Sequence, residues 1–367
     1  MAEGPWPEPD RARIGLCADC LHARRVESQR GSTFCLCGRS ADDPTYSRYP
    51  PLPVLRCSGY VPRQRIVSLL ASGTEIACAL GGGDALVGRS HECDNPEWVR
   101  ELPCCTSPTF DITLSSGEID REVRRRLKAG EPLYDVDLAL VNELRPGLLI
   151  TQTQCAVCAV TPDDVARAAG SVVVDQVVAL SAGSLAGIHE GVRSVGRALG
   201  RPEAAKLLIA DMERELDWIA NRVRDRFAPR VVLLEWTDPL FSTGNWGPEL
   251  VAAAGGRSLL SEAGQYSAAV SWGQVVEADP DYLVVAPCGF GLERTRREAS
   301  VLEALPGWSE TRAVRLGHVA LADGNRYFNR SGTTIPETVR ILAEILHPDC
   351  FEPTWRGRAW CAYRTQA

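Results

Sequence analysis

Two cysteines and their polar neighbours follow an apolar stretch with the pattern of a buried strand. The stretch "RPGLLI" is followed by "TQTQCAVCAV", which places Gln154, Cys155 and Cys158 just past the expected strand. In parallel α/β proteins this edge of the sheet is where ligands bind. The Cys-x-x-Cys pair alone fits a thiol redox pair, half of a metal site, or small residues in a tight loop. Other soft ligands expected at the same edge make it a candidate ligand site.

A second polar run, "SHECD", follows another expected strand and ends at Asp94. It holds an imidazole, two carboxylates and a thiol within five residues, and neutral imidazole and thiolate are common metal ligands. A polar turn in which Asp94 caps the next helix would also explain the run. The ligand-facing interpretation stays open beside it and gives His91, Glu92 and Cys93 as candidate binding residues.

Aromatic residues occupy loop positions in the C-terminal half of the chain. Trp236 directly follows an expected strand, and Trp246 lies in a glycine-flanked turn. Rings at loop ends that face a cleft suit a large planar ligand, because stacking rewards contact area, whereas burial in the core is the alternative. We favour the ligand-facing interpretation. It gives the candidates Trp236, Asn245, Trp246, Cys288, Phe290, Tyr327 and Phe328.

Five cysteines lie in the first 60 residues, as a Cys-x2-Cys pair, a Cys-x-Cys pair and Cys57. Residues 1–63 hold too few apolar side chains for a self-sufficient core, so a metal is expected to hold this module together. Structural zinc is the leading choice because four thiolates complete its tetrahedron, and an iron–sulfur cluster is the alternative. The expected ligands are Cys17, Cys20, Cys37 and Cys57, with Cys35 or His22 as substitutes.

The elements that must position these residues alternate between strands and helices. "RIVSLL" and "ALVGRS" predict buried strands on either side of the helix "SGTEIACALGGGD", and "RVVLLEW" and "DYLVVAPC" predict strands later in the chain. Such alternation predicts parallel sheets covered on both faces, and two such lobes would leave a cleft for small ligands. The expected segments are an α/β lobe at 65–180, a helical backbone at 181–228, a second lobe at 229–350 and a tail at 351–367.

The composition narrows the class of protein. The 367 residues suggest two or three domains, and a formal net charge of -7 argues against a general nucleic-acid or anionic-membrane binder. The N-terminus shows no apolar segment before a cleavage site and no long apolar run follows, so we expect no membrane segment, a cytoplasmic location and mostly reduced cysteines. No nucleophile elbow, P-loop or dinucleotide-binding glycine motif is present, which favours a binding protein over an enzyme.

Three stretches carry a resemblance to a known family: "RIVSLLASGTEIACALGGGDALVGRSHECDNP", "EWTDPLFSTGNWGPELVAAAGG" and "VVAPCGF". Over about 65–350 the chain resembles the cobalamin-binding, BtuF-like branch of the helical-backbone periplasmic-binding-protein superfamily, of class III or TroA-like fold. The first stretch is shared by siderophore and haem binders, so it indicates the fold more than the ligand. "SHECD", "QCxVC" and "EWxDP…GNW" look like a narrower subgroup commonly labelled cobalamin-binding.

The resemblance implies two Rossmann-like lobes, a rigid connecting helix and a corrinoid or metal chelate between the lobes. In transport relatives an acidic residue on each lobe engages the permease, and Glu75 and Glu249 match those positions. Glu75 is also counted among the candidate ligand-binding residues.

The leading hypothesis is a cytoplasmic binding protein for cobalamin or a related corrinoid. Trp236, Trp246 and Phe290 would stack on the macrocycle, and His91 or Cys93 would approach its metal. The alternative is a metalloenzyme or redox protein whose cleft cysteines and His91 hold zinc or an iron–sulfur cluster. A third possibility is an adaptor whose N-terminal cysteine-rich module binds a protein partner.

Overall fold

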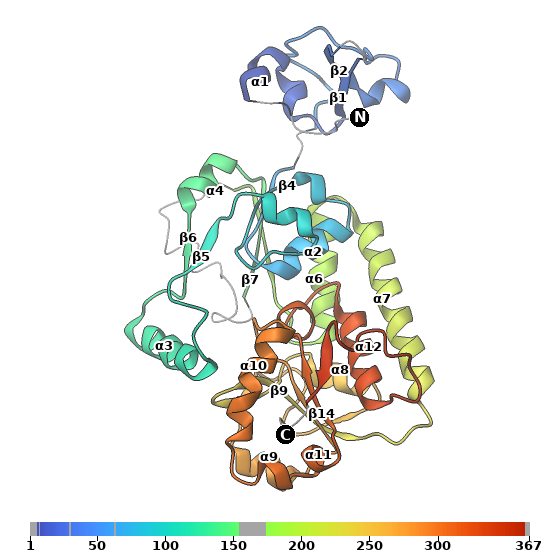
Figure 1. Ribbon diagram of the computed structural model, residues 1–367. Coiled ribbons are helices and arrows are strands. Elements are labelled where there is room, and N and C mark those ends of the chain that lie inside the picture. Colours follow the sequence, from blue (N-terminus) through green and yellow to red (C-terminus); the bar gives the residue numbers. More distant parts are fainter. Residues whose placement is uncertain (1–5, 7, 29–30, 62–63, 154–173, 364–367) are drawn as a thin grey trace. The chain divides into compact units, whose positions relative to one another are not determined.

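The computed structural model describes residues 6, 8–28, 31–61, 64–153 and 174–363. The chain forms two compact units, Met1–Ile66 and Val67–Ala367 (Figure 1). The second, larger unit is called the main unit below.

The described part of the first unit is a small antiparallel hairpin with one α-helix and two 3-10 helices, η1 (Leu16–Asp19) and η2 (Gly38–Ala41). Helix α1 spans Glu8–Ile14, and strands β1 (Ala23–Glu27) and β2 (Thr33–Cys37) pair along their whole length. Gly15 has a φ of 71°, and a Cβ there would collide with the Val54 backbone, so only glycine fits this approach. A compact core holds the unit together and consists of Trp6, Ile14, Cys17, Ala18, Cys20, Ala23 and Cys35.

The N-terminal lobe of the main unit is built on a four-stranded sheet in the order β4-β3-β7-β8. Every residue of β7 is buried, and its first three residues form an uninterrupted apolar run, as expected of a strand covered on both faces. Strands β7 and β8 run parallel, as the helix–strand alternation predicts. The elements are β3 (Ile66–Ser68), α2 (Ala71–Ala79), β4 (Leu86–Arg89), α4 (Leu138–Leu144), β7 (Leu148–Gln152) and β8 (Gln176–Leu180).

A separate arm extends from this lobe, and we use that name for residues 106–136 (Figure 1). Strands β5 (Thr106–Pro108) and β6 (Tyr134–Val136) pair antiparallel and carry helix α3 (Ser116–Ala129). A capping box at Ser115 begins α3, and Gly130 in the left-handed region ends it. The buried residues of α3 are confined to its first turn, so the arm is fixed by its base and by that turn.

Two helices connect the lobes along one side of the main unit (Figure 1). Helix α6 spans Leu185–Ala198, and α7 spans Pro202–Val223, a length of about 33 Å at 1.5 Å per residue. The chain turns between them at Gly200, which has a φ of 67°, and Pro202 opens α7.

The C-terminal lobe has a larger sheet in the order β12-β10-β9-β13-β14-β15, with β11 also paired to β9. Strands β9, β13 and β14 run parallel at its centre. Apolar clusters cover both faces of the sheet, as in a doubly wound fold. The elements are β9 (Arg230–Thr237), β10 (Leu240–Ser242), α8 (Gly247–Ala253), β11 (Arg257–Ser258), β12 (Ala268–Ala269), α9 (Trp272–Ala278), β13 (Tyr282–Val285), α10 (Leu292–Glu303), α11 (Arg312–Arg315), β14 (Val319–Ala322), the π-helical turn η6 (Gly324–Phe328), α12 (Ile335–Leu346) and β15 (Trp360–Ala362).

Part of the expected tail, residues 355–362, belongs to the C-terminal lobe. Strand β15 pairs antiparallel with β14, and the buried carboxylate of Glu344 on α12 accepts hydrogen bonds from the Trp355 and Arg356 amides and the Trp360 indole. These bonds satisfy a buried charge and attach residues 355–362 to the core.

Candidate functional site

Arg330 joins the two lobes through buried ion pairs. Its Nη1 donates a hydrogen bond of 2.6 Å to Glu75 Oε1 on α2, and its Nη2 lies 2.7 Å from Asp94 Oδ1 in the loop after β4. Its Nε donates to the Asn325 carbonyl at 2.8 Å, so its own lobe also holds the guanidinium. Arg330 is 4% exposed and Glu75 is 3% exposed. The first contact between the lobes is therefore a desolvated charge pair that requires both partners.

Small residues let the backbones meet around this ion pair. The hydroxyls of Ser72 and Ser331 are 3.4 Å apart, and Thr333 Oγ1 donates to Glu75 Oε2 at 3.4 Å. A Cβ at Gly332 would lie 3.1 Å from Ser72 Cβ, which leaves little room for a larger side chain. The segment 330–333 is thus fitted against the start of α2.

The structure separates the two candidate metal ligands in the loop after β4. The Cys93 side chain enters the core, where its Sγ lies 3.0 Å from Thr74 Oγ1, and burial raises its pKa to about 12. His91 is partly exposed, and its Nδ1 lies 2.7 Å from Thr106 Oγ1 at the base of the arm. Burial lowers the pKa of His91 to about 4, so its imidazole is neutral at physiological pH.

Glu92 sits between these residues, and burial raises the pKa of its carboxyl to about 7, although the charge of Arg330 lowers it. Burial also raises the pKa of Asp323, which precedes η6 in the other lobe. Acidic groups of both lobes therefore surround the buried guanidinium of Arg330.

A second contact between the lobes forms where the first turn of α3 meets β9. Trp236 Nε1 donates to the Ser116 carbonyl at 3.2 Å and to the Asp238 carbonyl at 3.1 Å. Ser116 Oγ in turn donates to Glu298 Oε2 on α10 at 2.8 Å. A Cβ at Gly117 would collide with the Asp238 carboxylate, so the arm approaches this closely only because that residue is glycine.

Trp236 and Phe290 form an aromatic pair at this contact. Their ring centroids are 5.1 Å apart, and Trp236 is partly exposed while Phe290 is 2% exposed. The guanidinium carbon of Arg294 lies 3.6 Å from the Phe290 centroid, and Arg294 Nη2 donates to the Leu114 carbonyl of the arm at 2.7 Å. Phe290 is therefore covered in this arrangement, and Trp236 keeps accessible ring surface.

The other aromatic candidates pack mainly within their own lobe. Phe328 belongs to the buried core, and Tyr327 lies edge-on to Trp355 at 5.5 Å. Trp246 packs partly against the same core, and its buried Nε1 forms no hydrogen bond with the described residues. Asn245, with a φ of 52°, sets the turn that leads to Trp246.

The remaining candidates are placed as follows. Cys288 is partly buried, and its amide donates to the Glu235 carbonyl at 3.0 Å. Glu249 Oε2 accepts from the Leu185 amide at 2.8 Å, which puts a carboxylate at the N-terminus of α6. Gln154, Cys155 and Cys158 lie outside the described residues.

The expected metal centre in the first unit is not supported. Cys17, Cys20 and Cys35 are buried in the small core, and burial raises the pKa of the Cys17 thiol to about 12. Cys35 is hydrogen-bonded to Cys17, whereas Cys37 and Cys57 are partly exposed. Across the described part of the chain, no three His, Cys, Asp or Glu side chains are arranged to hold a metal ion. The buried cysteines of the first unit pack as small apolar side chains, so zinc and iron–sulfur sites receive no support among the described residues.

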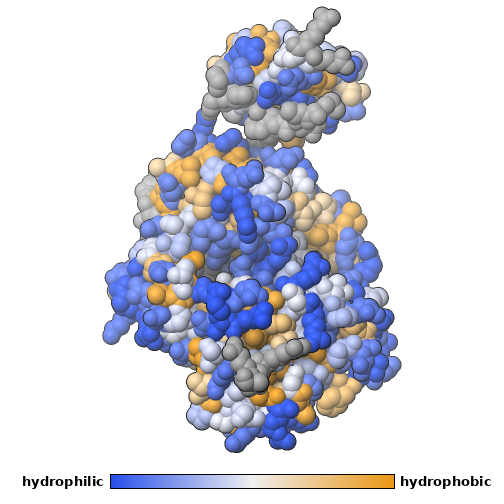
Figure 2. All heavy atoms as spheres, viewed as in Figure 1, coloured by the Kyte–Doolittle hydropathy of each residue, from blue (hydrophilic) through white to orange (hydrophobic). Residues whose placement is uncertain are grey.

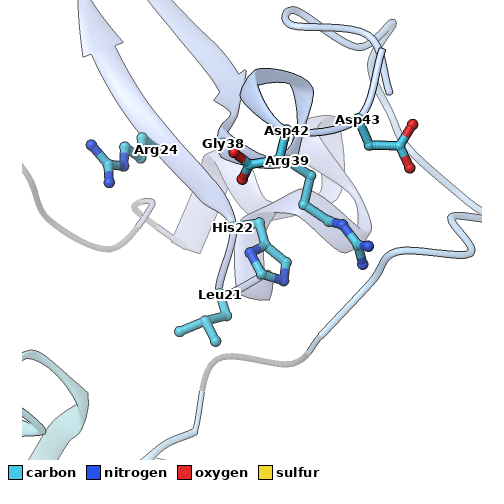
Figure 3. A pocket seen from close by; sticks show the side chains of 7 residues that line it. All are labelled: Leu21, His22, Arg24, Gly38, Arg39, Asp42 and Asp43. Atoms are coloured by element: carbon cyan, nitrogen blue, oxygen red, sulfur yellow. The ribbon is translucent and has the colours of Figure 1, made fainter. Parts of the chain in front are cut away.

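Neither of two hollows is lined by Arg330 or its partners, although the second includes Leu114 of the arm contact. One of about 550 Å³ lies in the first unit, where the His22 ring and the Arg39 side chain point into the same space (Figure 3). The other, of about 410 Å³, lies on the arm, whose visible face is hydrophilic (Figure 2). Its lining residues are Phe110, Asp111, Leu114, Glu118, Arg121, Glu122 and Arg125.

Sequence reasoning missed the residues that connect the lobes. No motif in the sequence marks Arg330, Arg294 or Ser116 as contact residues. Arg330 is also 255 positions from its partner Glu75. The one available signal was the small-residue segment "SGTT" after Arg330, which permits a close backbone approach.

Replacing Arg330 with methionine tests the first contact. We expect Arg330→Met to lower the free energy of unfolding by about 3–5 kcal/mol, because it leaves Glu75 buried without a counter-ion. The measurement is urea denaturation at pH 7.5. The control is Arg315→Met, which removes an exposed arginine of the same lobe that lies on α11 and should change stability by less than about 0.5 kcal/mol. Equal effects of the two substitutions would contradict the assignment.

The neighbours His91 and Glu92 should give opposite pH dependences. The unfolded chain binds a proton at His91 between pH 4 and 6.5 that the folded chain rejects, so this residue makes stability rise with pH. The folded chain keeps a proton on Glu92 between pH 4.5 and 7 that the unfolded chain releases, so this residue makes stability fall with pH. Relative to the wild type, His91→Gln should lose stability and Glu92→Gln should gain it as pH rises from 4.5 to 6.5. Urea denaturation across that range checks this, and difference curves of the same sign would refute it.

None of the described helices combines the length and apolar character needed to cross a membrane.

Comparison with known proteins defines the family. Residues 66–325 match the family described as Periplasmic binding protein. The chain is similar to the "Uncharacterized ABC transporter substrate-binding lipoprotein YvrC" of Bacillus subtilis, with 25% identity over 300 residues covering 79% of this chain and 82% of that protein. The fold is similar to that of the periplasmic heme-binding protein RhuT from Roseiflexus sp. RS-1, with 26% identity, a TM-score of 0.57 and coverage of 78% and 99%. It is also similar to the periplasmic vitamin B12 binding protein BtuF of Vibrio cholerae, with 19% identity, a TM-score of 0.55 and coverage of 77% and 96%.

These similarities correct two expectations. The cytoplasmic location is wrong, because the matching family is that of periplasmic binding proteins and the similar Bacillus protein is a lipoprotein. The expectation of mostly reduced cysteines rested on a cytoplasmic location and is therefore no longer supported. The BtuF-like branch is not singled out, since a heme-binding protein is as similar as BtuF. The family match covers more than half of the chain and the fold has the expected two lobes, so this protein belongs to the periplasmic binding protein family.

Proposed function

We propose that the main unit binds a metal chelate of the tetrapyrrole class, a corrinoid or a haem, between its lobes and serves as the substrate-binding protein of an ABC transporter. The observation that carries the proposal is Trp236, a partly exposed indole at the carboxyl end of a central strand, held where the two lobes meet. The names of YvrC, RhuT and BtuF supply the transport role and the two ligand types.

The surroundings of Trp236 suit a flat apolar ligand. Its N–H is already bonded to two carbonyls, so the indole is oriented and a ligand need not satisfy that donor. Phe290 supports one side of the ring system from the core. A pre-oriented aromatic surface favours stacking because little side-chain entropy remains to be lost on binding.

The contacts between the lobes support a binding protein that changes little in shape. Arg330 and Ser116 hold the lobes at two separate points, and α6 and α7 connect them along one side. A ligand that enters between the lobes would have to exchange some of these contacts for its own. Glu75 is occupied by Arg330 in this arrangement, and Glu249 remains the other proposed acidic contact for a permease.

Removing the Trp236 indole tests the function. We expect the wild-type protein to shift the absorption bands of hydroxocobalamin or of haem and to co-elute with one of them on a sizing column. Trp236→Ala should weaken that binding about tenfold or more, equivalent to about 1.4 kcal/mol of lost stacking. Trp218→Ala is the matched control, because Trp218 is a 40% exposed indole on α7, and it should leave the titration unchanged. Binding of neither chelate by the wild-type protein would overturn the proposal.

A further inference from the structure

Arg294 lies beside the proposed stacking surface and forms no ion pair with any residue that the structure describes. It lies on the first turn of α10, and its guanidinium covers the ring of Phe290 at 3.6 Å. We infer that Arg294 binds a carboxylate on the rim of the cargo, so the preferred ligand is a planar chelate with free carboxylates. This inference rests on the proposed function and assigns the ligand class within that site.

No carboxylate lies within ion-pair distance of Arg294 among the residues that the structure describes. Its hydrogen bond goes to the Leu114 carbonyl, a neutral acceptor. Glu298, one turn further along the same helix, is hydrogen-bonded to Ser116 instead. Arg296 on the same helix shows the contrast, because it pairs with Glu293 at 3.1 Å.

The surroundings of Arg294 also favour an added anion. Burial lowers the pKa of the Arg294 guanidinium. The charges of Glu298 and Asp111 raise this pKa and the charge of Arg297 lowers it, and the net effect is a lowered pKa. A partly desolvated cation that lacks a paired carboxylate is stabilised when an anion arrives.

The position of Arg294 places such an anion at the edge of a stacked ligand. Trp236 and Arg294 both contact Phe290, Trp236 by its ring and Arg294 by its guanidinium. A macrocycle that lies on the accessible face of Trp236 would bring its rim toward Arg294. The planar guanidinium offers two parallel N–H donors, which is the geometry that carboxylates prefer. A rim of neutral esters or amides could not form that charged pair.

The experiment compares two pairs of probes, in each of which one member has a charged rim carboxylate where the other has a neutral ester or amide. One pair is iron protoporphyrin IX and its dimethyl ester, and the other is a cobalamin monocarboxylic acid and cobalamin itself. Each is titrated into the full-length protein and followed by quenching of tryptophan fluorescence. For the chelate that binds, we expect the carboxylate form to bind about tenfold or more tightly than its neutral form.

Three variants locate the effect. Arg294→Met should abolish the preference for the carboxylate form, so that the two forms of a probe bind with equal affinity. Arg294→Lys should keep part of the preference, because the charge stays but the two-donor geometry is lost. Arg296→Met, which removes a paired and exposed arginine from the same helix, should keep the full preference. Circular dichroism and thermal unfolding confirm that each variant is folded.

The outcomes distinguish this inference from the proposed function. If no probe binds, both fail. If both forms of a probe bind equally to the wild type, or if Arg294→Met keeps the preference for the carboxylate, the assignment to Arg294 is overturned while the chelate-binding function stands. Loss of the preference in Arg294→Met alone supports the inference.

Discussion

The buried guanidinium of Arg330 is the constraint on which the arrangement of the lobes depends. It comes from a loop of the C-terminal lobe, and its two carboxylate partners, Glu75 and Asp94, come from the N-terminal lobe. Withdrawing one charged partner from such a buried pair leaves the other desolvated and uncompensated, so the pair specifies one arrangement of the lobes more sharply than apolar packing would. The small residues around it serve this pair by letting the backbones approach.

The arm supplies a second constraint of a different kind. Its contact with the C-terminal lobe uses carbonyls and one hydroxyl, which accept or donate bonds to Trp236, Arg294 and Glu298. None of these bonds joins two opposite charges, and the Trp236 bond is neutral on both sides, so the arm contact is the weaker of the two. Under the proposed function, the stronger contact at Arg330 would maintain the lobes while the cargo would enter beside the arm. The aromatic pair lies at the weaker contact.

The acidic loop after β4 shows how burial changes the chemistry of residue types. His91 and Cys93 are two positions apart and both are potential metal ligands, yet Cys93 is protonated in the core and His91 is neutral and partly exposed. The cysteines of the first unit follow the same rule, since they fill an apolar core without forming a metal centre among the described residues. Residue type alone therefore overstated the metal chemistry.

The sequence by itself determined the two α/β lobes and the edge at which the candidate residues lie. Parallel strands buried on both faces contain uninterrupted apolar runs, as in "LLI" and "VVLL", and the positions after them follow from the same local pattern. Only the tertiary structure decided which of those side chains turn inward, as Cys93 does, and which meet across the lobes, as Arg330 and Glu75 do. The physical reason is that periodicity depends on neighbours in the chain, whereas burial and ion pairing depend on residues hundreds of positions apart that approach only after both lobes have folded.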